Sequence, residues 1–110
     1  MTNPIWATKG AVLGDKTACK EYGLTRGEII DAINKGKLQY NVNYSYGNPY
    51  FKLIRMEVEA LVTKKYGEDY LKNKKLENEL VQVNKELRGL KSKISALEKR
   101  KVELLKKIGE

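Results

Sequence analysis

Residues 72–108 read KNKKLENELVQVNKELRGLKSKISALEKRKVELLKKI, a stretch that contains no proline. Its apolar side chains recur at alternating steps of four and three, with one gap filled by Lys101; they are Leu76, Leu80, Val83, Leu87, Leu90, Ile94, Leu97, Leu104 and Ile108. This spacing is a heptad seam, which a single helix cannot bury by itself. The sequence therefore predicts a long helix that pairs with a partner and carries a smaller unit at its N-terminal end.

The composition limits the classes of function that are open to this protein. The chain has 110 residues, a net charge of +8, one cysteine (Cys19) and no histidine. The charge favours a polyanionic partner such as nucleic acid, although a solvated lysine-rich surface is the plain alternative. Without histidine or a second cysteine, His-based nucleophile activation, disulfides and thiolate metal clusters are all missing. No signal peptide or membrane span is visible. We expect a cytoplasmic protein that is not an enzyme, binds no cofactor, metal or membrane, and lies in the nucleoid or nucleus when DNA-bound.

Two short helices are predicted near the N-terminus, after an irregular lead-in that adds one short extended segment. Asp15 is the expected N-cap of the first helix, which runs to Tyr22 and ends at Gly23. The second helix opens with Thr25 and Glu28 in a capping box and ends at Gly36. Its buried stripe is predicted from Ile29, Ile30, Ala32 and Ile33. Two short helices joined by a tight turn containing glycine form a helix-turn-helix pattern.

A β-hairpin and a third helix follow. Apolar and polar residues alternate from Leu38 to Ser45, which predicts a strand, and residues 46–49 (YGNP) predict a turn. A returning strand covers residues 50–55, and a helix covers residues 56–66 before a break at Gly67. We interpret the tyrosines at positions 40, 44, 46 and 50 as core of the hairpin rather than base-stacking groups. The fold class is thus mainly α with a small β-hairpin, divided into residues 1–66 and a coiled-coil helix, residues 67–110.

Residues 16–66 resemble the winged helix-turn-helix of MerR regulators and phage excisionases. The matching pieces are KTACKEYGLTRGEIIDAINKGKL and, after the hairpin, YFKLIRMEVEALV. Residues 20–24 (KEYGL), the later strand at residues 50–53 and the Tyr66-Gly67 pair at the end of a helix resemble the C-terminal DNA-binding part of the xeroderma pigmentosum group A repair factor. That family also has a four-cysteine zinc finger, which this sequence lacks. Small terminase subunits of tailed phages similarly join a winged helix to a charged assembly helix. Each resemblance implies contact with DNA.

The predicted DNA contacts come from two places. The second helix would enter the major groove with Thr25, Arg26, Asn34 and Lys35, because base edges are usually reached from the start of such a helix. The wing would touch the backbone or minor groove through Lys37, Asn43, Tyr46, Asn48 and Lys52. Glu28 and Asp31 lie near the same surface and would repel phosphate. Residues 1–66 carry a net charge of only +4, from ten basic and six acidic residues.

Charges beside the seam favour a parallel homodimer. With Leu80 at position a, each g residue of a parallel pair faces the e residue five further along its partner. The charged g–e′ pairs are then Lys72–Glu77, Glu86–Lys91 and Lys93–Glu98, all attractive. Every antiparallel register meets at least one like-charged pair, such as Lys72 with Lys107. The resembling MerR regulators nevertheless use an antiparallel coil.

Two hypotheses follow from the sequence. The first is a non-enzymatic protein that binds duplex DNA through the second helix and the wing, as a dimer joined by the coil. The second is an assembly or adaptor protein whose winged helix or coil binds another protein. The sequence names neither the DNA site nor the pathway, and it leaves open whether the coil pairs with itself.

Overall fold

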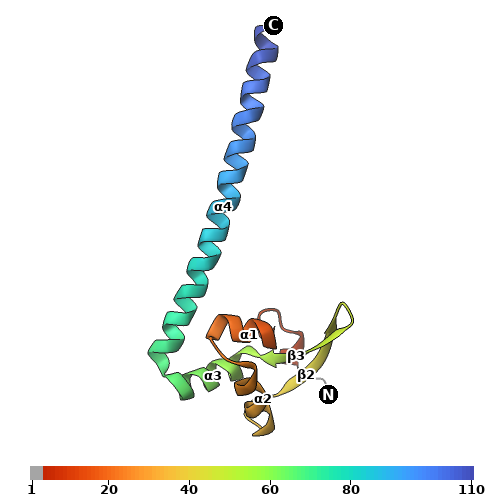
Figure 1. Ribbon diagram of the computed structural model, residues 1–110, viewed down its shortest axis with the longest axis vertical. Helices are drawn as coiled ribbons and strands as arrows, with labels where there is room; N and C mark the ends of the chain where they lie inside the picture. The colour runs from red at the N-terminus through yellow and green to blue at the C-terminus, as the bar shows by residue number, and fades with distance from the viewer. Residues whose placement is uncertain (1–3) are drawn as a thin grey trace. The chain divides into compact units, whose positions relative to one another are not determined.

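The computed structural model describes residues 4–110. It is mainly helical, with a small antiparallel sheet and a long C-terminal helix (Figure 1). The elements run in this order: η1 (Pro4–Ala7), β1 (Val12–Gly14), α1 (Asp15–Tyr22), α2 (Arg26–Asn34), β2 (Tyr40–Ser45), β3 (Asn48–Ile54), α3 (Arg55–Tyr66) and α4 (Glu68–Gly109). The chain divides into two compact units, residues 1–76 and 77–110. The first unit extends past residue 66, where the sequence pattern placed the boundary.

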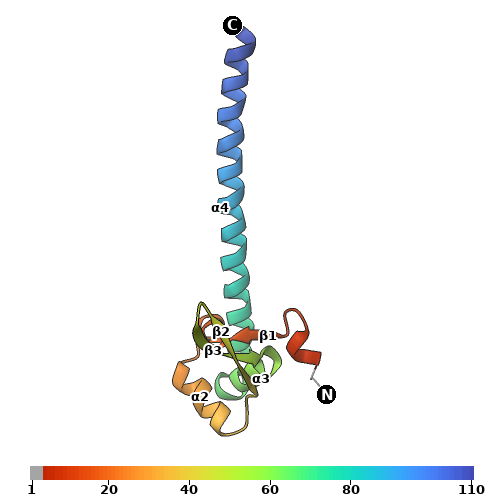
Figure 2. The same cartoon turned by 90° about the vertical axis from the view of Figure 1, so that its right-hand side faces the viewer.

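The sheet has the order β1-β3-β2, with both neighbours of β3 antiparallel to it (Figure 2). β1 is the short extended segment expected from the lead-in, and Leu13 pairs with Leu53 in its register. The core formed against this sheet contains buried side chains from β1, α1, α2, β3 and α3 and from two loop residues. They are Leu13, Ala18, Tyr22, Leu24, Ile29, Ala32, Leu38, Leu53, Val58, Leu61 and Val62. Three helices thus cover a sheet too small to be stable alone.

The turn between α1 and α2 has the C-terminal glycine and the capping box that the sequence predicts. Gly23 adopts a left-handed conformation (φ 69°) and its N–H donates to the carbonyl of Cys19. Thr25 and Glu28 form the predicted capping box: the Glu28 N–H donates to the Thr25 hydroxyl (3.1 Å), and the Thr25 N–H donates to the Glu28 carboxylate (3.0 Å). These two devices fix where α1 ends and α2 begins.

The prediction for Asp15 was wrong. Gly14 is the N-cap of α1 and gives no side-chain cap, while Asp15 is the first helical residue and is 2% exposed. Its carboxylate accepts from its neighbour's backbone, the Lys16 N–H (2.9 Å), and pairs with Arg26 (2.8 Å). The sequence pattern missed this because the residue that draws Asp15 inward lies eleven positions away.

Ile30 was also misplaced by the sequence pattern. It was assigned to the buried stripe of α2, but its side chain is 39% exposed. Only Ile29 and Ala32 are fully buried in this helix, with Ile33 half-buried. Ile30 is one helical step of about 100° away from Ile29 and shares its exposed side with Arg26 and Asn34, which are four residues away in each direction.

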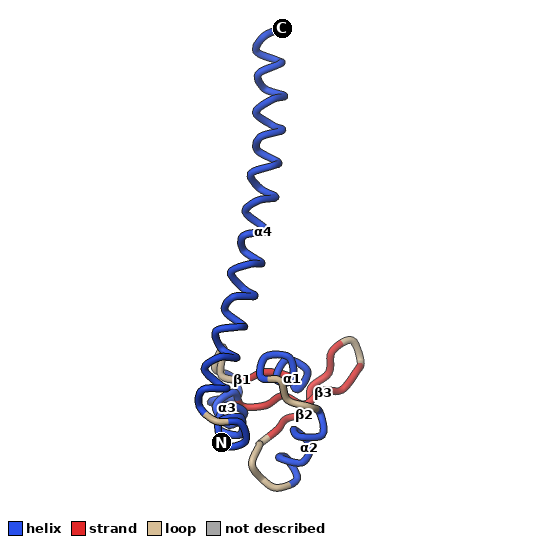
Figure 3. Tube along the Cα trace, turned by 60° about the vertical axis from the view of Figure 1, so that its left-hand side comes forward, coloured by secondary structure: helices blue, strands red, loops and turns tan. Residues whose placement is uncertain are grey.

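The β2–β3 hairpin is closed by a two-residue turn. Tyr46 (φ 50°) and Gly47 (φ 82°) both have positive φ, as a type I′ turn requires, and Ser45 pairs with Asn48 across it. The first strand begins at Tyr40 rather than at Leu38, which is buried just before it. Figures 1 and 3 show that the outer part of the hairpin extends beyond α1, α2 and α3.

The tyrosines of the hairpin are therefore not its core, contrary to the interpretation from sequence. Tyr40 is 48% exposed, Tyr44 70% and Tyr46 fully exposed, while Tyr50 is half-buried. Alternation correctly indicated which residues share a face of the strand. It could not indicate that no helix covers that face near the tip.

A buried hydrogen-bond network joins α1 to α3. The Tyr22 hydroxyl donates to Glu59 (2.6 Å) and accepts from Arg55 (2.8 Å), which also pairs with Glu21 (2.7 Å). Burial, with help from Glu59, raises the pKa of Tyr22 to about 12, so this hydroxyl keeps its proton at neutral pH.

The break after α3 falls at Gly67, as predicted. Its φ of 95° and ψ of 164° lie in a region open essentially only to glycine, and they end α3 before α4 begins at Glu68. The first turns of α4 still pack on the first unit: Tyr70 and Leu71 lie against its core, and the Tyr70 hydroxyl donates to the Tyr22 carbonyl (2.9 Å).

Candidate nucleic-acid interface

Arg26, at the start of α2, is held in place and still reachable. One guanidinium nitrogen donates to the buried Asp15 carboxylate (2.8 Å), and the guanidinium lies over the Phe51 ring at 5.7 Å from its centroid. The Arg26 side chain is nevertheless 61% exposed. Because a guanidinium has five N–H donors in a rigid fork, one ion pair leaves donors for a ligand.

The other predicted residues of α2 have mixed availability. Asn34 is exposed and lies eight residues after Arg26 on the same side of the helix, roughly 12 Å along its axis. Lys35 pairs with Asp31 at 3.0 Å, which neutralises the acid expected to repel phosphate and occupies the lysine at the same time. The Thr25 hydroxyl serves the capping box. Of the α2 set, Arg26 and Asn34 present the most accessible polar groups.

Glu28 is turned away from this surface. Its carboxylate accepts from the Tyr66 hydroxyl (2.6 Å) and from Lys65 (3.0 Å) at the end of α3, besides its bonds in the capping box. The hydrogen bond from Tyr66, followed by those from Thr25 and Lys65, lowers the pKa of Glu28 to about 2. Its negative charge is thus permanent but already compensated, so it adds little repulsion toward a polyanion.

The two faces of the hairpin differ in chemistry. In the β2–β3 register, Tyr40, Val42 and Tyr44 stand opposite Leu53, Phe51 and Pro49. Residues directly opposite each other point to the same side of a sheet. We call Tyr40, Val42, Tyr44, Pro49 and Phe51 the aromatic face; it continues outward from the buried Leu53, and Arg26 lies over its Phe51 ring.

The opposite side of the hairpin carries most of the predicted wing residues. Asn43 pairs with Tyr50, Asn41 with Lys52, and Ser45 with Asn48, so these six residues form a polar face. The predicted contacts Asn43, Asn48 and Lys52 therefore lie on the side away from Arg26. Tyr46, at the turn, is exposed enough to be reached from either side.

Tyr40, Tyr44 and Phe51 are the residues that sequence reasoning did not select. The edge of the Phe51 ring meets Tyr40, with ring centroids 5.3 Å apart, and this contact continues the surface started by Arg26. Their alternation in the sequence placed them on one face. Their exposure makes them candidates for contact with a ligand, and this exposure depends on how far the hairpin extends beyond the helices.

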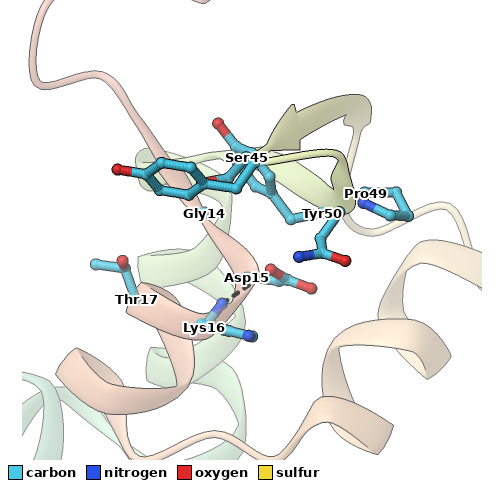
Figure 4. A pocket seen from close by; sticks show the side chains of 9 residues that line it. Gly14, Asp15, Lys16, Thr17, Ser45, Pro49 and Tyr50 are labelled. Carbon is cyan, nitrogen blue, oxygen red and sulfur yellow. Dashed lines mark hydrogen bonds between the residues drawn. The ribbon is translucent and has the colours of Figure 1, made fainter.

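An open hollow of about 500 Å³ lies beside the hairpin, between its outer half and the first turn of α1 (Figure 4). Asn48 lines it together with Ser45, Lys16 and Thr17, and a Cβ added at Gly14 would meet the Tyr50 ring at 3.4 Å. Asn48 is thus grouped with the start of α1 rather than with α2.

Lys37 occupies a third location. It precedes β2 and lines a shallow hollow with residues of α3, including Glu57 and Lys64. It is exposed there, at the base of the hairpin rather than along it. The nine predicted DNA contacts are therefore divided between the α2 surface, the hairpin tip, the polar face and this hollow.

The predicted seam of α4 is exposed along its whole length. All ten positions from Leu76 to Ile108, Lys101 included, are open to solvent in the single chain. In the first unit, the half-buried residues of α4 are Tyr70, Leu71 and Lys74, whereas Lys72, Asn73 and Leu76 are exposed. The helix thus packs on its own unit with one side and leaves the seam side uncovered.

Two searches within residues 4–110 give further findings. In this part of the chain, no group of three or more metal-ligating His, Cys, Asp or Glu side chains is close enough to hold an ion. Over the same residues, no helix is both long and apolar enough to cross a membrane.

Comparison with protein-family models, curated proteins and solved structures finds no match to this chain. The case for a function therefore depends on the geometry of α2, the hairpin and α4.

Proposed function

We propose that this protein is a non-enzymatic, duplex-DNA-binding protein, in which residues 1–66 form a winged helix-turn-helix and α4 joins two copies. The observation that carries the proposal is Arg26: it stands at the start of α2, oriented by Asp15 and Phe51, with most of its side chain open to a ligand. Such a role would place the protein in the cytoplasm, on the nucleoid or in the nucleus.

In this proposal α2 enters the major groove. Arg26 would make a bidentate contact to a guanine edge or a phosphate, since its orientation is set before DNA arrives and little rotamer entropy remains to be lost. Asn34 suits an adenine edge or a phosphate further along the groove. Thr25 and Lys35 would contact the backbone, with Lys35 exchanging Asp31 for a phosphate.

The hairpin would act as the wing, with its aromatic face toward the duplex. Tyr44 and Tyr46 offer hydroxyl donors to phosphates and flat rings to sugars. The polar-face residues Asn43, Asn48 and Lys52, and Lys37 at the base, would make outlying phosphate contacts that add affinity without adding sequence preference.

One unit alone would bind weakly. Both cations of α2 are already in ion pairs, and the +4 charge of residues 1–66 is small for a DNA-binding unit. Linking two such units turns the second contact into an intramolecular event at high effective concentration. The proposal therefore needs the coil as well as the winged unit.

Fluorescence anisotropy with a labelled duplex, titrated at several salt concentrations, tests the proposal. We expect affinity to fall steeply between about 50 and 200 mM salt, because the entropy gained when cations leave the DNA becomes smaller as the salt concentration rises. Arg26→Lys should weaken binding by roughly tenfold, since lysine preserves the charge beside Asp15 but cannot make a bidentate contact. Adding Lys35→Ala should weaken it further.

Matched variants of the hairpin separate its two faces. Tyr44→Ala should reduce affinity several-fold, whereas Asn43→Ala, the adjacent residue on the polar face, should change it less. Circular dichroism confirms that each variant is folded. If Arg26→Lys with Lys35→Ala binds duplex DNA as tightly as the native protein, α2 is not the contact element.

A second candidate is a protein-binding adaptor. It is favoured by the apolar character of the exposed aromatic face, in which Tyr40 and Val42 are each 48% exposed and carry no charge. An adaptor would retain its protein partner after nuclease treatment and at 500 mM salt, and Tyr44→Ala would release that partner. Loss of every partner after nuclease treatment would instead support DNA binding.

A further inference from the structure

Within residues 4–110, no other element covers the seam of α4. Residues 79–110 are exposed throughout, including eleven large apolar side chains on the seam and beside it. An isolated helix in water is marginal, and most helices depend on packing of an apolar side. The stability of this segment therefore depends on a surface supplied from elsewhere.

The first turns of α4 show which side is available. Leu71 and Lys74 are half-buried on the first unit, and Lys75 pairs with Glu59 of α3 at 3.1 Å. With Leu80 at position a, these three residues occupy positions f, b and c. Asn73 at a and Leu76 at d are exposed, so the seam remains open even where α4 packs on its own unit.

We propose that the occupant is a second copy of this chain, paired with the first as a parallel, in-register, two-stranded coiled coil that begins at Asn73. Parallel pairing places Lys72 beside Glu77, Glu86 beside Lys91 and Lys93 beside Glu98, with no like-charged g–e′ pair. Antiparallel registers lack this complementarity; one that aligns the full seam sets Lys91 against Lys91 and Lys93 against Lys93.

Two polar residues at a positions strengthen the assignment of register. Asn73 and Lys101 interrupt an otherwise apolar set of a positions, and a single polar residue at a is a device that specifies register and oligomer state. In the in-register pair each meets its own copy: the Asn73 amides can hydrogen-bond across the interface, and the Lys101 stems extend outward to solvent. A shifted register would place each of them against an apolar residue.

The pairing brings both N-terminal units to the same end of the coil, because α4 begins within the first unit. Parallel pairing rests on the part of the proposed function in which α4 joins two copies, but not on DNA binding, and its test contains no DNA. Failure of either proposal can therefore be recognised separately.

Disulfide cross-linking in a Cys19→Ala background tests orientation. Leu76→Cys and Leu104→Cys, both at d, should each form disulfide-linked dimers under mild oxidation, while Ser92→Cys at the outer f position should not. Light scattering should give twice the 12.6 kDa chain mass before oxidation. A monomer, a trimer, or cross-linking of Leu76→Cys to Ile108→Cys or Lys101→Cys of the other copy would overturn the proposal.

A charge exchange provides a test that introduces no cysteine. Lys91→Glu sets two glutamates against each other in both symmetric g–e′ pairs of the parallel dimer, and should weaken dimerisation roughly tenfold at low salt. The double variant Glu86→Lys with Lys91→Glu restores opposite charges and should recover most of the loss. Failure of the double variant to recover would count against the parallel arrangement.

Discussion

At the scale of single residues, the molecule is organised by acidic side chains that hold elements together. Asp15 joins the start of α1 to the start of α2 through Arg26, and Glu28 joins the start of α2 to the end of α3 through Lys65 and Tyr66. The sequence pattern identified the short-range contact of Glu28, the capping box, because its two partners are three residues apart. The long-range contacts of Asp15 and Glu28 depend on the tertiary fold and could not be predicted from residue spacing.

Glu28 should make stability depend on pH in the acid range. Its folded-state pKa of about 2 lies below the ordinary value of 4.5, so its contribution is complete above pH 4.5 and is lost as the pH falls toward 2. Because solvent screens the ion pair and hydrogen bonds of this carboxylate, the contribution should be about 1 kcal/mol. Glu28→Gln keeps a capping acceptor but removes the charge. Urea unfolding should show it less stable than the native protein at pH 7 and equally stable near pH 2; an unchanged difference at low pH would contradict the role assigned to this carboxylate.

At the scale of elements, most helix and strand boundaries could be predicted from the sequence, but the solvent exposure of several side chains could not. The heptad, the glycines at 23, 36 and 67, and the capping box are short-range signals, and α2, α3 and α4 begin or end within one or two residues of them. Ile30 and the tyrosines of β2 were misjudged because their burial depends on which neighbours cover them. The candidate interface includes these residues, so only part of it could be predicted from the sequence.

Gly67, between α3 and α4, and Gly89, inside α4, should respond in opposite ways to alanine. Gly67 has a backbone conformation that a Cβ strains, so Gly67→Ala should destabilise the protein by about 1–3 kcal/mol. Gly89 lies inside α4 with open space around it, and Gly89→Ala should stabilise by about 1 kcal/mol by raising helix propensity. Thermal unfolding followed by circular dichroism measures both. Equal effects of the two substitutions would show that the break at Gly67 is not required.

At the scale of the whole molecule, α4 belongs both to the fold of one chain and to the proposed pair. Tyr70 and Leu71 pack on the core of the first unit, and the same helix continues as the seam. A first unit that is stabilised by pairing becomes more stable as the protein concentration rises. Unfolding of the first unit and dissociation of the pair should therefore be linked.

Trp6 fluorescence, reporting on the first unit, should show this linkage. A hundredfold rise in protein concentration should raise the free energy of unfolding by up to about 2.7 kcal/mol and increase Tm. Leu87→Lys places a charge in the middle of the seam and should abolish the dependence on concentration while leaving the first unit folded. A native Tm that is independent of concentration would show that the first unit folds without reference to pairing.

The hairpin tip has one further consequence. Tyr46 adopts a φ of 50° in a turn where glycine, asparagine or aspartate is usual, and its ring is wholly exposed. No packing within residues 4–110 favours tyrosine at this place, whereas the proposed wing would give its ring a contact with DNA. A laboratory population selected only for heat resistance should replace Tyr46 early, gaining stability while weakening the proposed DNA contact.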